Sequence, residues 1–288
     1  MKLFSFGEVL FDLFGETAHI GGAPLNLAAH FVRQGGEASL CSAVGRDALG
    51  EQASAAVAAL GVDPSYLATH EGLPTGSCAV TVDALGVPHY DLRDGVAYDA
   101  IPMPVGVHGF DILAFGTLAL RHPPNRAVLG RLIAEGGFGE IYTDLNIRPP
   151  YSTVEAVRFC LSAATLAKIS EEEMAAVTEA ALGRILAGEE AARVLAAQYP
   201  NLRLLIVTEG ERGAFAYDPR SGEVVRVAAC PVKVASTVGA GDSFGAAFLY
   251  AYLLGKPLSE CLAVAARVSA LVVSRTEAVP EYRIEDLF

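Results

Sequence analysis

The chain has 288 residues, of which 52% are hydrophobic and 19% charged, and its mean hydropathy is +0.38. These values exclude a disordered or low-complexity chain, and the length suits one large α/β domain or at most two; we favour a single globular unit over residues 1–288. The formal net charge of −12 excludes general attraction to nucleic acid or to an anionic membrane surface, so an anionic ligand has to be held by a local site.

Cysteine usage and the apolar runs predict a cytoplasmic protein. The five cysteines are odd in number and lack Cys-x-x-Cys spacing, which argues against a disulfide framework and against a thiolate metal site. The apolar run at residues 3–14 is interrupted by acidic residues and is not followed by a cleavage-like site, so we expect no signal peptide. The apolar run at residues 262–273 is too short to span a bilayer.

The start of the chain predicts a strand followed by a helix. Residues 2–13 alternate as a first strand, with Asp12 near its exit end. A glycine pair and a proline within residues 19–26 then lead into an apolar helix over residues 25–33. Asn26 is therefore expected in the first turn of that helix.

The next segments predict a second strand, a second helix and a flap. Residues 37–44 alternate as a strand, and Asp47 is a suitable N-cap for a helix that runs to residue 60. Between residues 75 and 98 two short polar strands flank a turn at residues 83–86. We expect this hairpin to lie outside the main sheet.

Short buried strands then alternate with helical stretches. We expect these strands at residues 111–119, 140–145, 166–169 and 202–207. The alternation implies a mostly parallel sheet with helices on both faces, in which ligands bind at the carboxyl ends of the strands. The residues expected at those ends include Asp12, Asn146, Arg148, Ser170, Thr208 and Gly210.

The segment Ser-Thr-Val-Gly-Ala-Gly-Asp-Ser-Phe, residues 236–244, predicts a helix N-terminus. It separates an alternating run at residues 223–234 from an apolar helix at residues 245–254. Gly239-Ala240-Gly241 permits a ligand to approach the backbone closely, and the first N–H groups of a helix have no intrahelical acceptor. Together with the helix dipole, these groups predict a phosphate-binding site.

Asp242 lies within this predicted anion site and has two interpretations. A carboxylate in the first turn commonly caps a helix or compensates its dipole. Beside a phosphate, the same carboxylate is suited to accept the proton of an attacking hydroxyl as a general base. The segment matches neither a P-loop nor a Rossmann turn, because no Gly-Lys-Ser/Thr ending occurs and the third glycine of a dinucleotide fingerprint is replaced by Phe244.

Further motifs occur in a fixed order along nearly the whole chain. They are Gly7-Glu-Val9, Gly21-Gly-Ala-Pro-Leu-Asn26 followed by Gly35 and Gly45, Ser42 to Asp47, Pro74-Thr-Gly76, Asp144 to Arg148, Thr208 to Gly213 and Ser236 to Asp242. In this order and spacing they resemble the ribokinase-like, or pfkB-type, carbohydrate kinases, most closely bacterial fructokinases. The resemblance implies a three-layer α/β/α fold with a mostly parallel sheet and a small β lid.

The resemblance also implies a reaction, the transfer of the γ-phosphoryl group of ATP to a sugar hydroxyl. In this interpretation Asp242 is the general base and Gly239 to Gly241 form the anion hole, with D-fructose as the expected acceptor and Mg²⁺ accompanying ATP. The alternatives that stay open are the same chemistry on 2-keto-3-deoxygluconate, ribose or a nucleoside, and a non-catalytic protein that binds a sugar or nucleotide.

Sugar contacts are implied for Asp12, Gly22 and Asn26, whose carboxylate and amide groups suit hydrogen bonds to diols. The structural alternatives are a solvated strand-end charge for Asp12 and a helix-start residue for Asn26. Arg148 resembles the family arginine that meets the phosphates, against the alternative of a surface ion pair.

Nucleotide contacts are implied for Lys168, Thr208, Gly210 and Gly213. Glu173 stands where many relatives carry a glutamate linked to magnesium, and a contact through water suits the preference of Mg²⁺ for oxygen ligands. The alternative is that three glutamates in a first helical turn compensate the dipole.

Two departures from the family argue against potassium activation. Ser236 replaces an aspartate that helps to hold a monovalent cation, and Glu277 replaces a glycine in the downstream cation-site loop. The family position of the lid corresponds to residues 9–20 and 75–98 in this chain. Such a lid excludes water from the reaction, and by resemblance it predicts a homodimer formed through the lid.

Overall fold

The structure is a computed structural model that describes residues 1–14, 17–82 and 88–283. Its main sheet contains β1 (Lys2–Phe6), β4 (Glu37–Gly45), β5 (Leu67–His70), β8 (Ile112–Phe115), β9 (Glu140–Asp144), β10 (Leu166–Ser170), β11 (Leu204–Thr208), β12 (Ala214–Asp218) and β13 (Glu223–Val227). The strand order is β13-β12-β11-β10-β9-β8-β1-β4-β5, and all pairs are parallel except β11–β12 and β12–β13. The predicted mostly parallel sheet is confirmed.

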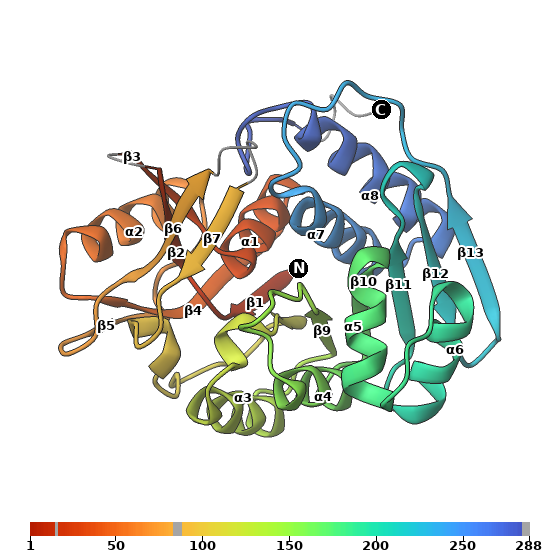
Figure 1. Cartoon of the computed structure of the whole chain (residues 1–288), viewed down its shortest axis with the longest axis horizontal. Helices are drawn as coiled ribbons and strands as arrows, with labels where there is room; N and C mark the ends of the chain where they lie inside the picture. Colours follow the sequence, from red (N-terminus) through yellow and green to blue (C-terminus); the bar gives the residue numbers. More distant parts are fainter. Residues whose placement is uncertain (15–16, 83–87, 284–288) are drawn as a thin grey trace.

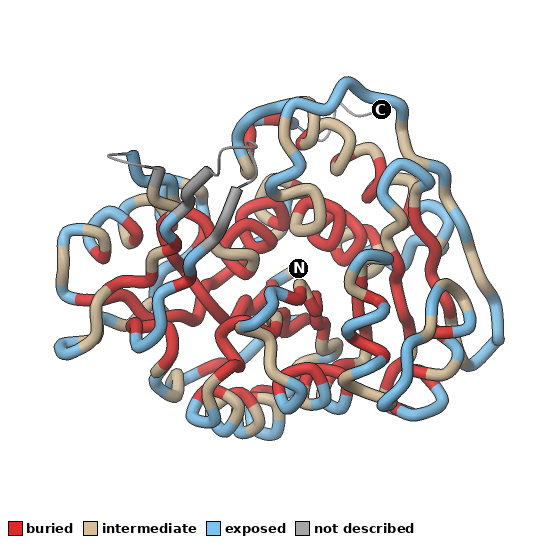
Figure 2. Tube along the Cα trace, viewed as in Figure 1, coloured by how far each residue is buried: buried red, intermediate tan, exposed pale blue. Residues whose placement is uncertain are grey.

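Helices cover both faces of this sheet and complete three layers (Figure 1). One face carries α1 (Ala23–Arg33), α2 (Ala48–Ala59), α7 (Ala240–Leu253) and α8 (Leu258–Val273); the other carries α3 (Pro123–Glu135), α4 (Val154–Ala163), α5 (Glu171–Leu182) and α6 (Gly188–Gln198). Successive strand residues face opposite layers, so Leu3 packs with the first set of helices and Phe4 with the second. The central strands are buried on both faces, whereas the edge strands β5 and β13 are partly exposed (Figure 2).

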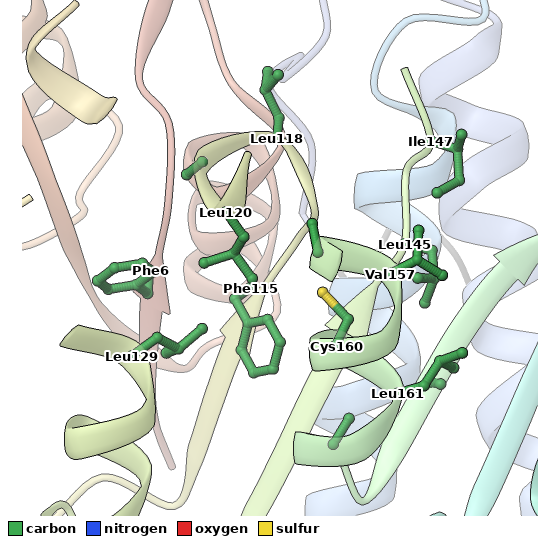
Figure 3. Close-up of a cluster of buried hydrophobic side chains, with 14 of the residues drawn as sticks. Phe6, Phe115, Leu118, Leu120, Leu129, Leu145, Ile147, Val157, Cys160 and Leu161 are labelled. Carbon is green, nitrogen blue, oxygen red and sulfur yellow. The ribbon is translucent and has the colours of Figure 1, made fainter. Parts of the chain in front are cut away.

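The hydrophobic core on the α3–α6 face extends to the carboxyl ends of the strands, where the sequence predicted ligand binding. Figure 3 shows Phe6 and Phe115, from adjacent strands, beside Leu129 of α3. Leu145 and Ile147 continue this buried layer beyond the carboxyl end of β9. The polar residue that follows, Arg148, is thus held at the carboxyl edge by an anchored backbone.

The prediction of a single strand over residues 2–13 was wrong. The main-sheet strand β1 ends at Phe6, and β2 (Leu10–Phe14) belongs to a second sheet with order β3-β2-β6-β7. The hydrophobic pattern of the sequence is similar in β1 and β2. It therefore did not reveal that the two strands belong to different sheets. Asp12 consequently lies within the second sheet, paired with His19 and Cys78, and not at the carboxyl end of a core strand.

The second sheet is the predicted lid. Its remaining strands are β3 (Thr17–Gly21), β6 (Gly76–Val82) and β7 (Pro88–Leu92), and β6 and β7 pair antiparallel as the expected hairpin. The turn predicted at residues 83–86 lies outside the described residues.

Several predicted boundaries differ from the structure in the C-terminal half. The strand expected at residues 223–234 ends at Val227, and β12 was not predicted. The predicted N-cap Asp47 is confirmed, since its side chain accepts a hydrogen bond from the Gly50 N–H at 2.8 Å. In the described part of the chain, no helix combines the length and the apolarity that a membrane crossing demands.

Candidate active site

The N-terminus of α7 has the backbone geometry of an anion site. Gly239 is its N-cap residue, with φ 79° in the left-handed region, and a Cβ there would lie 2.4 Å from the Ala278 carbonyl oxygen. Within the described residues no side chain caps this helix end. The first-turn N–H groups of Gly241 and Asp242 have no intrahelical acceptor. They form a partly exposed set of donors at the positive end of the helix dipole.

The carboxylate of Asp242 is held at this helix end by Asn26 of α1. The Asn26 Nδ2 group donates to Asp242 Oδ2 at 2.8 Å. Burial, followed by the nearby charge of Asp144, raises the pKa of Asp242 to about 6, against the opposing effects of Asn26, Lys168 and Arg148. An oriented carboxylate with a pKa near neutrality has the properties of a general base.

A buried ion pair lies beneath the same helix end. Lys168 and Asp144 are paired in register on β10 and β9, and their side chains face α7 because they lie two residues beyond Leu166 and Tyr142, which face that layer. The Lys168 Nζ group donates to the two Asp144 oxygens at 2.9 and 2.7 Å. A Cβ on Gly241 would lie 3.1 Å from Lys168 Nζ, so the ammonium directly adjoins the predicted anion hole.

The lid contributes a second carboxylate. Asp12 is half-buried in β2, and burial is the main reason that its pKa is raised. The Arg148 guanidinium lowers the pKa of both Asp12 and Asp242, so one cation influences the predicted sugar contact and the predicted base. Gly22, at the N-cap of α1, precedes Asn26 by four residues and its carbonyl accepts the Asn26 N–H at 3.0 Å.

Arg148 is exposed and oriented by the loop after β9. Its backbone N–H donates to the Ser152 hydroxyl at 2.8 Å, and its guanidinium contacts the Ile147 carbonyl at 3.4 Å. This arrangement leaves most of its planar set of donors available to an anion.

Comparisons with known proteins identify the family of this chain. The profile of the pfkB family carbohydrate kinases matches residues 4–283. The chain belongs to this family. It is 30% identical to a fructokinase of Klebsiella pneumoniae over 86% of this chain and 83% of that protein. It is 27% identical to a 5-dehydro-2-deoxygluconokinase of Shouchella clausii over 92% and 84% of the two chains.

A solved structure is also similar to this carbohydrate kinase. An uncharacterized sugar kinase from Pyrococcus horikoshii, in complex with ATP, superposes with a TM-score of 0.84 at 27% identity. The similarity covers 99% of this chain and 96% of that one. The protein is therefore a sugar phosphotransferase with the ribokinase-like fold.

The kinase uses Glu173 as part of a helix cap. Ser170 and Glu173 form a reciprocal capping box at the start of α5, and the Ile147 N–H donates to the second carboxylate oxygen of Glu173 at 2.5 Å. Each oxygen keeps one lone pair beyond these backbone donors, so the carboxylate fits a role as acceptor for a magnesium-bound water. Such an ion would neutralise phosphate oxygens of the nucleotide.

The predicted nucleotide residues lie on a neighbouring strand end. Thr208 ends β11 next to Ser170, and Gly210 begins the short 3₁₀ turn Gly210–Arg212 before β12. A Cβ on Gly213 would lie 2.0 Å from the Val227 carbonyl oxygen. This close approach explains why the position is a glycine without any contact to a nucleotide. Among the described residues, these three make no hydrogen bond to the group around Asp242.

Sequence reasoning gave no role to Glu8, which the structure adds to the site. Its side chain is only 3% exposed, and burial raises its pKa to about 7. Asp242 contributes to this rise, while N–H groups of Glu8 and Ala23 and the charge of Arg148 oppose it. The available signals were a carboxylate within an apolar run and its place in the Gly7-Glu-Val9 motif.

The two positions that depart from the family pattern are engaged locally. The Ser236 hydroxyl accepts the Val238 N–H at 3.2 Å, and the Ser236 N–H donates to the Val273 carbonyl at 3.2 Å. Glu277 is exposed, and its own backbone N–H is the main cause of its lowered pKa. Its carboxylate thus interacts with its own loop.

Proposed function

We propose that this kinase transfers the γ-phosphoryl group of ATP to D-fructose and forms fructose 6-phosphate. The observation that carries the proposal is the position of Asp242, which Asn26 holds at 2.8 Å on the open N-terminus of α7. The similarity to a bacterial fructokinase supports fructose as the acceptor.

Each residue of the site has a defined task in this reaction. Asp242 accepts the proton of the sugar hydroxyl while that oxygen forms a bond to the γ-phosphorus. The bond from phosphorus to the β,γ-bridging oxygen breaks, and ADP leaves with the electron pair. The N–H groups of Gly241 and Asp242, with Arg148, stabilise charge on the transferred group. Bound magnesium supplies further positive charge at the phosphates, and Glu173 would meet it through water.

The charges around the lid favour a neutral acceptor. Arg93 is exposed at the end of the lid hairpin. Arg121 is buried and binds Asp99 at 2.8 Å, so it is not available to a sugar acid. A keto-deoxy sugar acid is the second candidate, because relatives act on such a compound by name and Arg148 influences Asp12.

We also propose how the chain is organised in solution. Residues 1–288 act as one kinase unit in the cytoplasm, with Asp12 on the lid and Asp242 on the core brought to one sugar. Among the described strands, β3 and β7 lie at the edges of the lid sheet, which supports a homodimer formed through the lid. Light scattering after gel filtration would measure the mass.

The test is ADP release with ATP and Mg²⁺ against a panel of neutral sugars, keto-deoxy acids and nucleosides. We expect the highest turnover on fructose. In the Asp242→Asn protein, turnover should fall by about 10²- to 10⁴-fold with the fold retained, because the base is lost. Highest turnover on another acceptor would replace the substrate. No turnover on any acceptor, with ligand affinity unchanged by Asp242→Asn, would refute the catalytic proposal in favour of a binding protein.

A further inference from the structure

A buried histidine on α1 connects the site to the segment that follows α8. His30 has no exposed surface and lies four residues after Asn26, so the two side chains lie on the same face of α1. Its Nδ1 atom is 3.0 Å from the Tyr282 hydroxyl, and its Nε2 atom is 2.9 Å from the Ala278 carbonyl oxygen.

These partners determine the direction of every hydrogen bond in the chain of contacts. A carbonyl only accepts, so His30 Nε2 carries the hydrogen and donates to Ala278. Nδ1 is then unprotonated and accepts the Tyr282 O–H, while the Gln34 Nε2 group donates to the same Tyr282 oxygen at 2.9 Å. Burial lowers the pKa of His30 to about 4, which preserves the neutral form that this arrangement requires.

The hydrogen-bonded relay from Gln34 through Tyr282 and His30 to Ala278 ends at the N-terminus of α7. The carbonyl oxygen of Ala278 that accepts from His30 is the atom that would lie 2.4 Å from a Cβ on Gly239. Gly239 is the N-cap of α7, and its own carbonyl accepts the Ser243 N–H at 2.9 Å. Contact with Ala278 therefore limits the position of the first turn of α7.

The same face of α1 thus touches both parts of the reaction centre. Asn26 holds the Asp242 carboxylate, and one turn later His30 holds the backbone against which Gly239 packs. We propose that His30 is a positioning residue: through Ala278 it fixes the phosphate-binding N–H groups of α7 relative to Asp242. The inference rests on the proposed transfer from ATP but not on the identity of the sugar.

The test compares four variants with the full-length enzyme. His30→Leu removes both hydrogen bonds, and His30→Gln retains a donor near the Nε2 position. Tyr282→Phe removes only the upstream O–H. Thr178→Val is the matched control, because Thr178 is equally buried on α5 and its hydroxyl bonds the Met174 carbonyl and the Leu186 N–H at 2.8 and 3.0 Å.

For His30→Leu we expect kcat/KM for ATP to fall by about 10- to 100-fold, with KM for the acceptor little changed, because a displacement near 1 Å has effects of this size. His30→Gln should recover part of the loss, and Tyr282→Phe should show a smaller loss. Thr178→Val should lower the unfolding temperature without changing either KM. A folded His30→Leu protein with wild-type kinetics for ATP would overturn the proposal.

Two measurements remain decisive if a variant does not fold or no acceptor is found. Calorimetry gives the affinity for ATP without any sugar, so weaker binding by His30→Gln or Tyr282→Phe supports the positioning role even where the fructose proposal fails. Unchanged affinity in both variants overturns it. In ¹⁵N spectra of the wild-type protein at neutral pH we expect the Nε2–H tautomer of His30. The Nδ1–H tautomer would contradict the relay.

Discussion

The two helices that meet at the active site, α1 and α7, begin in the same way and serve different purposes. Each follows a glycine at positive φ, 117° for Gly22 and 79° for Gly239, and each glycine lies where a Cβ would approach a carbonyl oxygen to 2.4 Å. These oxygens belong to Glu8 and Ala278. The close approach fixes each helix start against another segment of the backbone.

The two helix starts differ in what their N–H groups meet. At α1 the Ala23 N–H lowers the pKa of the buried Glu8 carboxyl group, so the chain supplies a carboxyl group of its own there. At α7 the only acid in the first turn is Asp242, which Asn26 holds, and the turn is partly exposed. The same backbone arrangement at a helix N-terminus can therefore be a structural contact or an anion-binding site. The outcome depends on whether a carboxyl group of the chain already lies against the N–H groups.

The largest kinetic effects are expected when Gly22 and Gly239 are each replaced by alanine. The two variants should distinguish the role of the α1 start from that of the α7 start. In Gly239→Ala the new methyl group displaces the Ala278 loop, and we expect kcat/KM for ATP to fall by about 100-fold. In Gly22→Ala the strain falls on Glu8 and the lid side, so KM for the sugar should rise while KM for ATP changes little. Each variant should also lose roughly 1–3 kcal/mol of stability, measured by denaturant unfolding. Identical kinetic patterns in the two variants would remove the distinction.

The carboxylates of the two helix starts should also appear in the pH dependence of stability. The folded-state pKa of Glu8 is raised from 4.5 to about 7, so its favourable contribution is complete below 4.5 and is lost as the pH rises through 7. Glu8→Gln should remove this loss and stabilise the protein at pH 8 by up to about 3 kcal/mol, with little gain near pH 4.5.

Asp242→Asn serves as the comparison for this experiment. The pKa of Asp242 is raised to about 6 from 3.8, so its gain should develop at lower pH and be complete by about pH 7. Thermal unfolding from pH 4.5 to 8 checks both curves. If the stability of both variants changed with pH in parallel with the wild type, the folded-state pKa of neither carboxylate would be raised.

The smallest effect is expected from the monovalent cation. Ser236 brings no carboxylate to the loop before α7, and Glu277 interacts with its own loop, while His30 holds Ala278 by a hydrogen bond. The turnover rate should therefore change little when potassium is replaced by a bulky organic cation at equal ionic strength. A large stimulation by potassium would rule out this interpretation.

The sequence predicted what depends on local chemistry. The N-cap Asp47 was found because its partner Gly50 lies three residues away, and the start of α7 was found because its glycines directly precede an apolar run. The parallel sheet followed from the alternation of strands and helices, as confirmed by the strand order. Asp12 was assigned to the wrong sheet because alternation with period two is common to both sheets.

Partners far apart in the chain were not predictable. The pairing of Lys168 with Asp144 depends on the register of two strands, and the burial of Glu8 depends on how the lid and α1 fold over it. The bond from His30 to Ala278 joins residues 248 positions apart. A single sequence has no periodicity or spacing that reports such a contact.

That separation has a consequence for biosynthesis. At about 5–20 residues per second, a ribosome needs roughly 12 to 50 s to add the 248 residues between His30 and Ala278. During this time the residues of α1 have been synthesised, but His30 cannot yet donate its hydrogen bond to the Ala278 carbonyl. The nascent kinase therefore gains a fully restrained phosphate-binding helix only after Ala278 has been added.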